Sequence, residues 1–148
     1  MNRLVSPSLA LACAVLSMPA AAQFAKTEDA IKYRQSAMFI QNNHLGRLGA
    51  IVNGRVPYDA AVALANAEVV ERISHLPWAG FGAGTEGGKA KPEIWKEQAK
   101  FKELNERLMA DTEKLAAAAK TGNLDAVKAA VANVGETCKT CHDTFRKK

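Results

Sequence analysis

The run Cys138–His142, with the sequence Cys-Lys-Thr-Cys-His, is the feature that most constrains this chain of 148 residues. In a helix, residues three and four positions apart share a face, so both thiols and the imidazole would point the same way. Two such thiols can each add to a vinyl group of haem, and the imidazole can then reach the iron. This spacing is the haem c attachment pattern. The sequence therefore predicts one covalent haem c, held by Cys138 and Cys141, with His142 as an axial iron ligand.

Two other uses of a Cys-x-x-Cys pair fit the chain less well. A redox dithiol of the thioredoxin kind is expected in a β-α-β setting, and the chain shows no convincing strand pattern. A structural zinc ion needs four ligands, whereas the remaining histidines, His44 and His75, are remote in sequence. Haem attachment is favoured over both.

The first 22 residues have the pattern of a secretory signal. Arg3 supplies a positive charge, Leu4–Met18 is mainly apolar, and Ala20–Ala22 offers a small-residue cleavage site before Gln23. The stretch is too short for a membrane span. We expect residues 1–22 to be removed, together with Cys13, and residues 23–148 to form one haem-binding domain that has no membrane segment.

The charge balance gives no sign of a nucleic-acid partner. The chain has 20 Lys and Arg against 15 Asp and Glu, and loss of Arg3 with the signal leaves 19 against 15. The lysines alternate with acidic residues along the predicted helices, which is typical of solvated helix faces.

Four helical segments are predicted, separated by turn signals. They run from an N-cap at Thr27 to Asn53–Gly54, from Pro57 to Leu76, from Glu93 to Lys120 and from Leu124 to Arg146. Short first and third connections favour an all-α, antiparallel up-down-up-down four-helix bundle. The one long connection, residues 77–92, is expected either to be mobile or to fold over something.

Apolar residues at three- and four-residue spacing predict the inner face of each helix. The inner rows are Ile31, Arg34, Met38, Gln41, Leu45, Leu48 and Val52; then Tyr58, Val62, Ala65, Val69, Ile73 and Leu76; then Ile94, Phe101, Leu104, Leu108, Leu115 and Ala118; and finally Leu124, Val127, Val131, Val134, Cys138, Cys141 and Phe145. The haem anchors thus lie on the core face of the last helix. Haem would fill the space between the helices, roofed by the first.

A second protein ligand to the iron must come from upstream, because no Met or His follows His142. The candidates are Met38, Met109, His44 and His75. Met38 is the strongest because it lies on an inner row, yet a methionine at helical spacing is more often core filling. The sequence leaves both roles open.

Other residues are placed near the haem by their spacing from these positions. Arg34 and Gln35 lie one turn before Met38, where guanidinium and amide donors could bind the haem propionates. Arg146 lies one turn after His142, on its proximal side or bonded to the last helix carbonyls.

The long connection carries two aromatic residues, Trp78 and Phe81. They are expected to pack on the haem or beneath this connection, with ordinary core packing as the alternative.

Several stretches resemble the cytochrome c prime family of class II c-type cytochromes. They are residues 28–35, Leu76–Trp78 leading to Gly84–Gly88, Pro92–Trp95 and Val134–His142, and the resemblance spans residues 23–148. It implies a four-helix bundle in the periplasm, propionate contacts from Arg34 and Gln35, and a basic residue at Arg146 beside a proximal pocket. It also implies that Met38 occupies the distal position, which covers the iron in cytochrome c prime but coordinates it in electron-carrying relatives.

We therefore expect a non-enzymatic haem protein with five-coordinate iron on His142 and Met38 over the distal face, binding nitric oxide and carbon monoxide. Bound dioxygen is helped by a distal hydrogen-bond donor, and a thioether offers none. The alternative is a six-coordinate electron carrier with Met38 as the sixth ligand and a redox partner protein.

The resemblance also implies a homodimer formed through the first two helices. Four residues off the inner rows could supply its apolar surface: Tyr33, Phe39, Ile40 and Val70.

Overall fold

The computed structural model describes residues 23–148, so the predicted signal at residues 1–22 lies outside the described part of the chain. Its helices are α1 (Thr27–Val52), α2 (Ala60–Ser74), the 3₁₀ helix η1 (Pro77–Phe81), α3 (Glu93–Lys96), α4 (Gln98–Lys120) and α5 (Leu124–Phe145). Across residues 23–148 there is no strand, only an isolated antiparallel bridge between Ala90 and Arg146.

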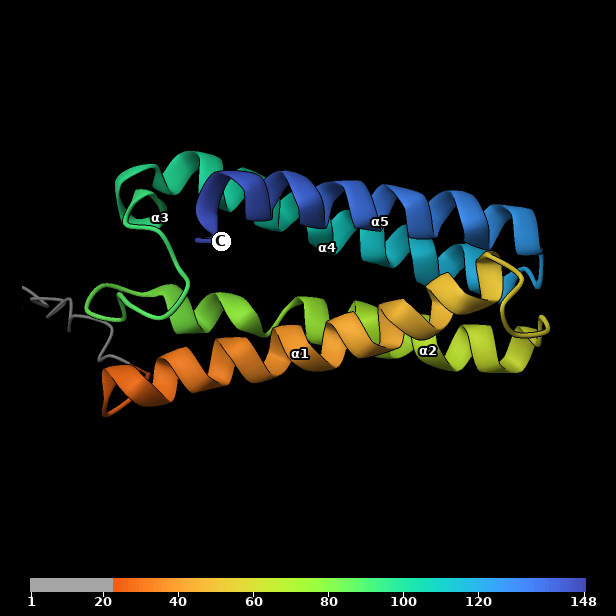
Figure 1. The fold of residues 1–148 in the computed structure, drawn as a ribbon, viewed down its shortest axis with the longest axis horizontal. Helices are drawn as coiled ribbons and strands as arrows, with labels where there is room; N and C mark the ends of the chain where they lie inside the picture. Colours follow the sequence, from red (N-terminus) through yellow and green to blue (C-terminus); the bar gives the residue numbers. More distant parts are fainter. Residues whose placement is uncertain (1–22) are drawn as a thin grey trace, which may run out of the picture.

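The four long helices form the predicted antiparallel up-down-up-down bundle. Each packs on two neighbours, in the order α1 to α2, α2 to α4, α4 to α5, and α5 back to α1. In Figure 1 the pair α1 and α2 lies below the pair α4 and α5. The start of α1, the connection from α2 to α4, and the C-terminus meet at the left end of this view.

Two predicted helix starts are wrong. Lys26 occupies the N-cap position of α1, and the hydroxyl of Thr27 instead donates to the carbonyl oxygen of Gly84, at 2.8 Å. Helix α2 begins at Ala60, three residues after Pro57, because the carboxylate of Asp59 accepts hydrogen bonds from the first free backbone N–H groups.

The third predicted helix is broken. Glu97 has φ −109° and ψ 48°, which is outside the helical region, and separates the single turn of α3 from α4. No Pro or Gly marks this break in the sequence. The fourth helix follows the prediction closely, and Asn123 caps its start through bonds to the N–H groups of Asp125 and Ala126.

The core confirms most of the predicted faces of α4 and α5, where Leu115, Val127 and Val134 are fully buried. The exception is Leu124 at the first position of α5, which is 37% exposed. The predicted face of α2 is wrong, since Val62 and Leu76 are 48% and 41% exposed. The side chains that α2 buries instead are Ala63, Asn66, Ala67, Val70 and Ser74.

Hydrogen bonds explain the shifted face of α2. Asn66 donates to the carbonyl oxygen of Val62 and pairs with His44, and Ser74 donates to the carbonyl oxygen of Glu71. Polar side chains can occupy inner positions when they are paired in this way. Val70, expected on a second apolar surface, is consequently part of the core.

Within residues 23–148, no helix combines the length and apolar character needed to cross a membrane.

Candidate haem site

A cavity of about 490 Å³ lies between α1, the connection after η1 and the end of α5. Helix α1 contributes Arg34, Gln35 and Met38 to its wall, and the end of α5 contributes Cys141, His142 and Arg146. The volume is within the range of small-molecule sites, roughly 300–1,000 Å³. Residues predicted from two distant parts of the sequence thus face one space.

Of the predicted site residues, Cys138 and Trp78 do not line this cavity. Cys138 is partly buried against the main core. Trp78 stands behind the wall, with ring centroids 6.3 Å from Phe81 and 5.9 Å from Phe101, both of which line the cavity.

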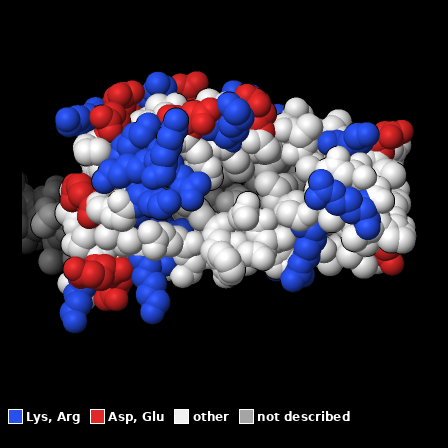
Figure 2. Space-filling model, in the orientation of Figure 1, with Lys and Arg blue, Asp and Glu red and all other residues white. Residues whose placement is uncertain are grey.

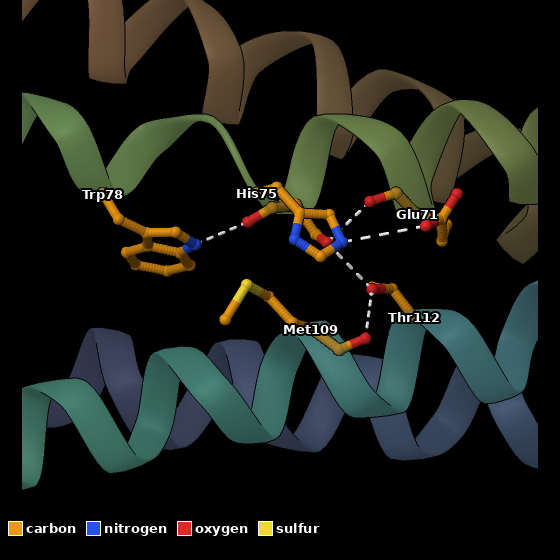
Figure 3. Close-up of polar contacts among 6 residues, drawn as sticks. Glu71, His75, Trp78, Met109 and Thr112 are labelled. Carbon is orange, nitrogen blue, oxygen red and sulfur yellow. Dashed lines mark hydrogen bonds and ion pairs between the residues drawn. The ribbon is translucent and has the colours of Figure 1, made fainter.

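Trp78 is fixed by polar contacts at the end of α2. Its indole N–H donates to the carbonyl oxygen of Ser74 at 2.6 Å, and the hydroxyl of Thr112 on α4 donates to that of Ser74 at 3.0 Å (Figure 3). The first contact satisfies a carbonyl that the helix end leaves free. Trp78 therefore supports Phe81 from an anchored position.

Burial raises the pKa of both motif thiols, and that of Cys141 reaches about 11, with Cys138 adding to the effect. A reactive redox dithiol needs a lowered thiol pKa, so the thioredoxin-like alternative is not favoured. In residues 23–148, no three His, Cys, Asp or Glu side chains gather as zinc ligands would.

The pKa of His142 is lowered, first by burial and then by the charge of Arg146, with Asp143 opposing. The imidazole is therefore neutral at neutral pH, the form in which histidine binds a metal. Arg146 is exposed, and its side chain lines the cavity on the His142 side.

Arg34 is only 3% exposed and holds the connection between η1 and α3. One terminal nitrogen donates to the carbonyl oxygens of Gly80 and Thr85 at 2.5 and 2.7 Å, and the other donates to that of Gly87 at 2.9 Å. The guanidinium carbon also lies 4.5 Å from the ring centroid of Phe81. Burial lowers the pKa of Arg34, but a guanidinium stays charged in proteins.

The predicted propionate contact of Arg34 stays a prediction, and the structure adds this second role. The sequence identified Arg34 as a polar residue on an inner row but carried no sign of its carbonyl partners. They are more than 45 residues away and are brought to it only by the tertiary fold.

The same connection is fastened to the end of α5, a contact that the sequence did not reveal. The ammonium group of Lys91 donates to the carbonyl oxygens of Asp143 and Thr144, each at 3.1 Å. The backbone N–H of Lys147 donates to the carbonyl oxygen of Lys89 at 2.8 Å. Residues 80–91, which we call the strap, thus join α1 to the helix that carries Cys141 and His142.

Basic side chains gather at this end of the molecule, where Figure 2 shows Lys and Arg over the end of α5. Lys89 and Arg146 line the cavity there. The charge pattern along the predicted helices did not reveal this cluster, because it forms where the strap brings its lysines beside the basic C-terminal residues.

Met38 is the one upstream ligand candidate that lines the cavity. His44 is bonded to Asn66 at 2.9 Å. His75 Nε2 lies 3.7 Å from a carboxylate oxygen of Glu71. Met109 is on α4, where its carbonyl oxygen accepts a hydrogen bond from the hydroxyl of Thr112 (Figure 3). Any methionine ligand must therefore be Met38.

These residues fit a covalently bound haem. Two thiols and a neutral imidazole come from one helix, and the cavity has a suitable size. On α1, the buried amide nitrogen of Gln41, three residues after the cavity-lining Met38, has no partner within residues 23–148. Fold and site together define a c-type haem protein built on a four-helix bundle. Cys138 and Cys141 would carry the thioether links, and His142 would bind the iron.

Comparison with known proteins agrees with this class. A sequence model of the family Cytochrome C' matches residues 29–146. The chain is 53% identical over 126 residues to cytochrome c' of Alcaligenes xylosoxydans xylosoxydans, covering 85% of this chain and 99% of that protein. It is 46% identical over 129 residues to cytochrome c' of Rubrivivax gelatinosus, covering 85% and 100%.

Among solved structures, the nitric oxide complex of a point mutant of cytochrome c prime from Alcaligenes xylosoxidans matches with a TM-score of 0.83. The two sequences are 52% identical, and the match covers 85% of this chain and 99% of that one. The chain belongs to the cytochrome c prime family, whose members carry covalently attached haem c.

Proposed function

We propose that this haem c protein reversibly binds nitric oxide, and carbon monoxide as a probe ligand, on the face of the haem opposite His142. The observation that supports it is that His142 and Met38 come from different helices and line one cavity. Methionine is a flexible, adaptable side chain, so it can cover the iron and still move aside. A relative has been solved as a nitric oxide complex.

Absorption spectra of the ferric and ferrous protein, before and after addition of carbon monoxide and nitric oxide, test this proposal. We expect five-coordinate, high-spin iron in the free protein and ready uptake of both gases. A low-spin spectrum that carbon monoxide does not change would contradict the proposal.

The steric role of Met38 has its own test, the substitution Met38→Ala. Removing the thioether side chain opens the distal space, so carbon monoxide should bind faster in stopped-flow mixing. Met109→Ala is the matched control, because Met109 does not line the cavity. Equal association rates of carbon monoxide in the two variants would show that Met38 does not hinder access to the iron.

The alternative is a six-coordinate electron carrier with iron bound by His142 and Met38. It is favoured by the position of Met38, which makes it the one candidate ligand in the cavity. A low-spin spectrum with a methionine-to-iron charge-transfer band, lost in Met38→Ala, would establish this alternative. Electron transfer to a redox partner can also be a secondary role of the five-coordinate form.

We further propose a periplasmic location, a homodimer formed through α1 and α2, and no enzymatic role. The location is supported by the signal pattern of residues 1–22, and mature protein from a periplasmic extract should begin at Gln23.

The proposed absence of an enzymatic role is argued from the distal side of the haem. A peroxidase needs an acid-base group near the bound peroxide, and the inner row of α1 carries no His or carboxylate. Robust turnover of peroxide by the purified haem protein would contradict the proposed non-enzymatic role.

A further inference from the structure

Eight polar or charged side chains are buried within residues 23–148: Arg34, Gln41, Asn66, Ser74, Thr85, Asp111, Thr112 and Thr137. Seven of them form at least one hydrogen bond. The exception is Gln41, which is 6% exposed and whose Nε2 atom has no partner in this part of the chain. Unpaired buried amides are costly and rare, so each calls for a partner.

The position of Gln41 indicates where that partner lies. Gln41 follows Met38 by three residues and precedes Asn42, and both of these neighbours line the cavity. Gln41 does not itself line the cavity, but it follows Met38 by about 4.5 Å along the helix axis and is next to Asn42, so it adjoins the part of α1 that forms the cavity wall. The other unpaired buried atom among the described residues, the hydroxyl of Tyr58, belongs to a side chain packed on the main core.

We propose that Gln41 is a ligand-selecting residue, whose amide Nε2 donates a hydrogen bond to a diatomic ligand bound on the Met38 side of the haem. This inference rests on the proposed function. Haem presents two kinds of acceptor, its propionates and its axial ligand. The propionates are predicted beside Arg34 and Gln35, and Arg34 is seven residues, or about 10 Å, from Gln41 along α1. The axial ligand is the acceptor left for Gln41.

Met38 and Gln41 then act one after the other as a ligand binds. The thioether covers the distal face in the ligand-free protein, and its displacement uncovers the amide for the incoming ligand. The sequence had suggested, from Met38 alone, that the distal side is purely apolar. With Gln41 as a donor, the distal side also has a polar group. A ligand that gains negative charge on binding is stabilised most by such a hydrogen-bond donor.

The test compares the ferrous carbon monoxide complexes of the intact haem protein and of Gln41→Met, a substitution that keeps the length of the side chain and removes its donor. A hydrogen bond to the ligand lowers the carbon monoxide stretching frequency, so the variant should show a higher frequency. Carbon monoxide should also leave roughly two- to tenfold faster, the effect of one lost neutral hydrogen bond. Gln98→Met makes the same change at an exposed position outside the cavity and should alter neither quantity.

A measurement on the unsubstituted protein guards against a variant that fails to fold. Transfer from H₂O to D₂O should shift the carbon monoxide stretch, because the amide hydrogen exchanges. If the protein binds carbon monoxide but neither Gln41→Met nor D₂O moves the stretch, the role of Gln41 is wrong and the proposed function stands. If the unsubstituted protein takes up no carbon monoxide, the proposed function fails, and the role of Gln41 fails with it.

Discussion

Arg34 and Gln41 are the two buried polar side chains of α1, and they have different surroundings. Arg34 is surrounded by carbonyl oxygens and aromatic rings of the strap and η1, whereas the amide nitrogen of Gln41 has no partner in residues 23–148. The helical period placed both on the inner row. Their roles depend on what lies opposite them, and for Arg34 that is a segment far away in sequence.

Replacing Arg34 by Met should destabilise the fold by about 3 kcal/mol, because carbonyl oxygens of Gly80, Thr85 and Gly87 would lose a charged donor in a buried site. Thermal unfolding of the haem protein, followed by circular dichroism, measures the loss. Arg47→Met is the control, since Arg47 is exposed on the same helix. Equal losses in the two variants would show that the bonds to the strap do not contribute.

Acid should detach His142 from the iron at a pH that depends on its charged neighbours. A proton competes with iron for the imidazole, and the lowered pKa of His142 delays this competition to lower pH. Arg146→Gln removes a cation and raises that pKa, so detachment should begin at higher pH. Asp143→Asn removes an anion and should move it to lower pH.

Acid titration of the haem absorption spectrum follows both of these changes. Each shift should be less than about one pH unit, because exposed charges are screened by salt and solvent. Shifts of the same sign in Arg146→Gln and Asp143→Asn would contradict the electrostatic explanation.

At the scale of the elements, the approach of η1 to α1 depends on one glycine. A Cβ atom at Gly80 would lie 2.8 Å from the carbonyl oxygen of Ala30 and 2.9 Å from Cβ of Arg34. Gly80→Ala must therefore push η1 away from α1 and should cost on the order of 1–3 kcal/mol. Gly82→Ala is the control, because a Cβ atom there meets nothing within 4 Å. Denaturant unfolding should separate the two variants; a Gly80→Ala protein as stable as Gly82→Ala would contradict the close packing.

The helices show which elements a sequence pattern can predict. The faces of α4 and α5 follow the apolar spacing because large apolar residues such as Leu115 and Val134 fill them. The face of α2 does not, because Asn66 and Ser74 are paired inside while Val62 faces solvent. Side-chain hydrogen bonds between helices, such as that from Thr112 to Ser74, leave no periodic signal in either helix.

At the scale of the whole molecule, one part of the candidate site could be predicted from the sequence and another part could not. The spacing of Cys138, Cys141 and His142 is local, so the sequence was sufficient to predict this part of the site. The strap is not local: Arg34 holds one end of it, and Lys91 joins the other end to the C-terminus of α5. The strap therefore links α1 to the end of α5, the two helices that face the haem cavity.

The proposed dimer is a property of the whole molecule, and the exposed apolar residues of α1 and α2 allow it to be tested. Ile40 on α1 and Val62 on α2 are 41% and 48% exposed, and Phe39 on α1 is 69% exposed. These residues lie on the two adjacent helices through which pairing is proposed, whereas Val70 is buried and cannot contribute. A stable interface buries roughly 800 Å² on each partner, so a carboxylate introduced into it would be desolvated without a counter-charge.

Ile40→Glu and Val62→Glu should therefore convert the dimer to a monomer while leaving the haem absorption spectrum unchanged, because neither side chain lines the cavity. Sedimentation equilibrium over a range of protein concentrations gives the mass and the dissociation constant. Leu124→Glu places the same charge at an exposed apolar residue of α5, outside the proposed interface, and should leave the protein dimeric. A monomeric unsubstituted protein, or equal dissociation in all three variants, would contradict pairing through α1 and α2.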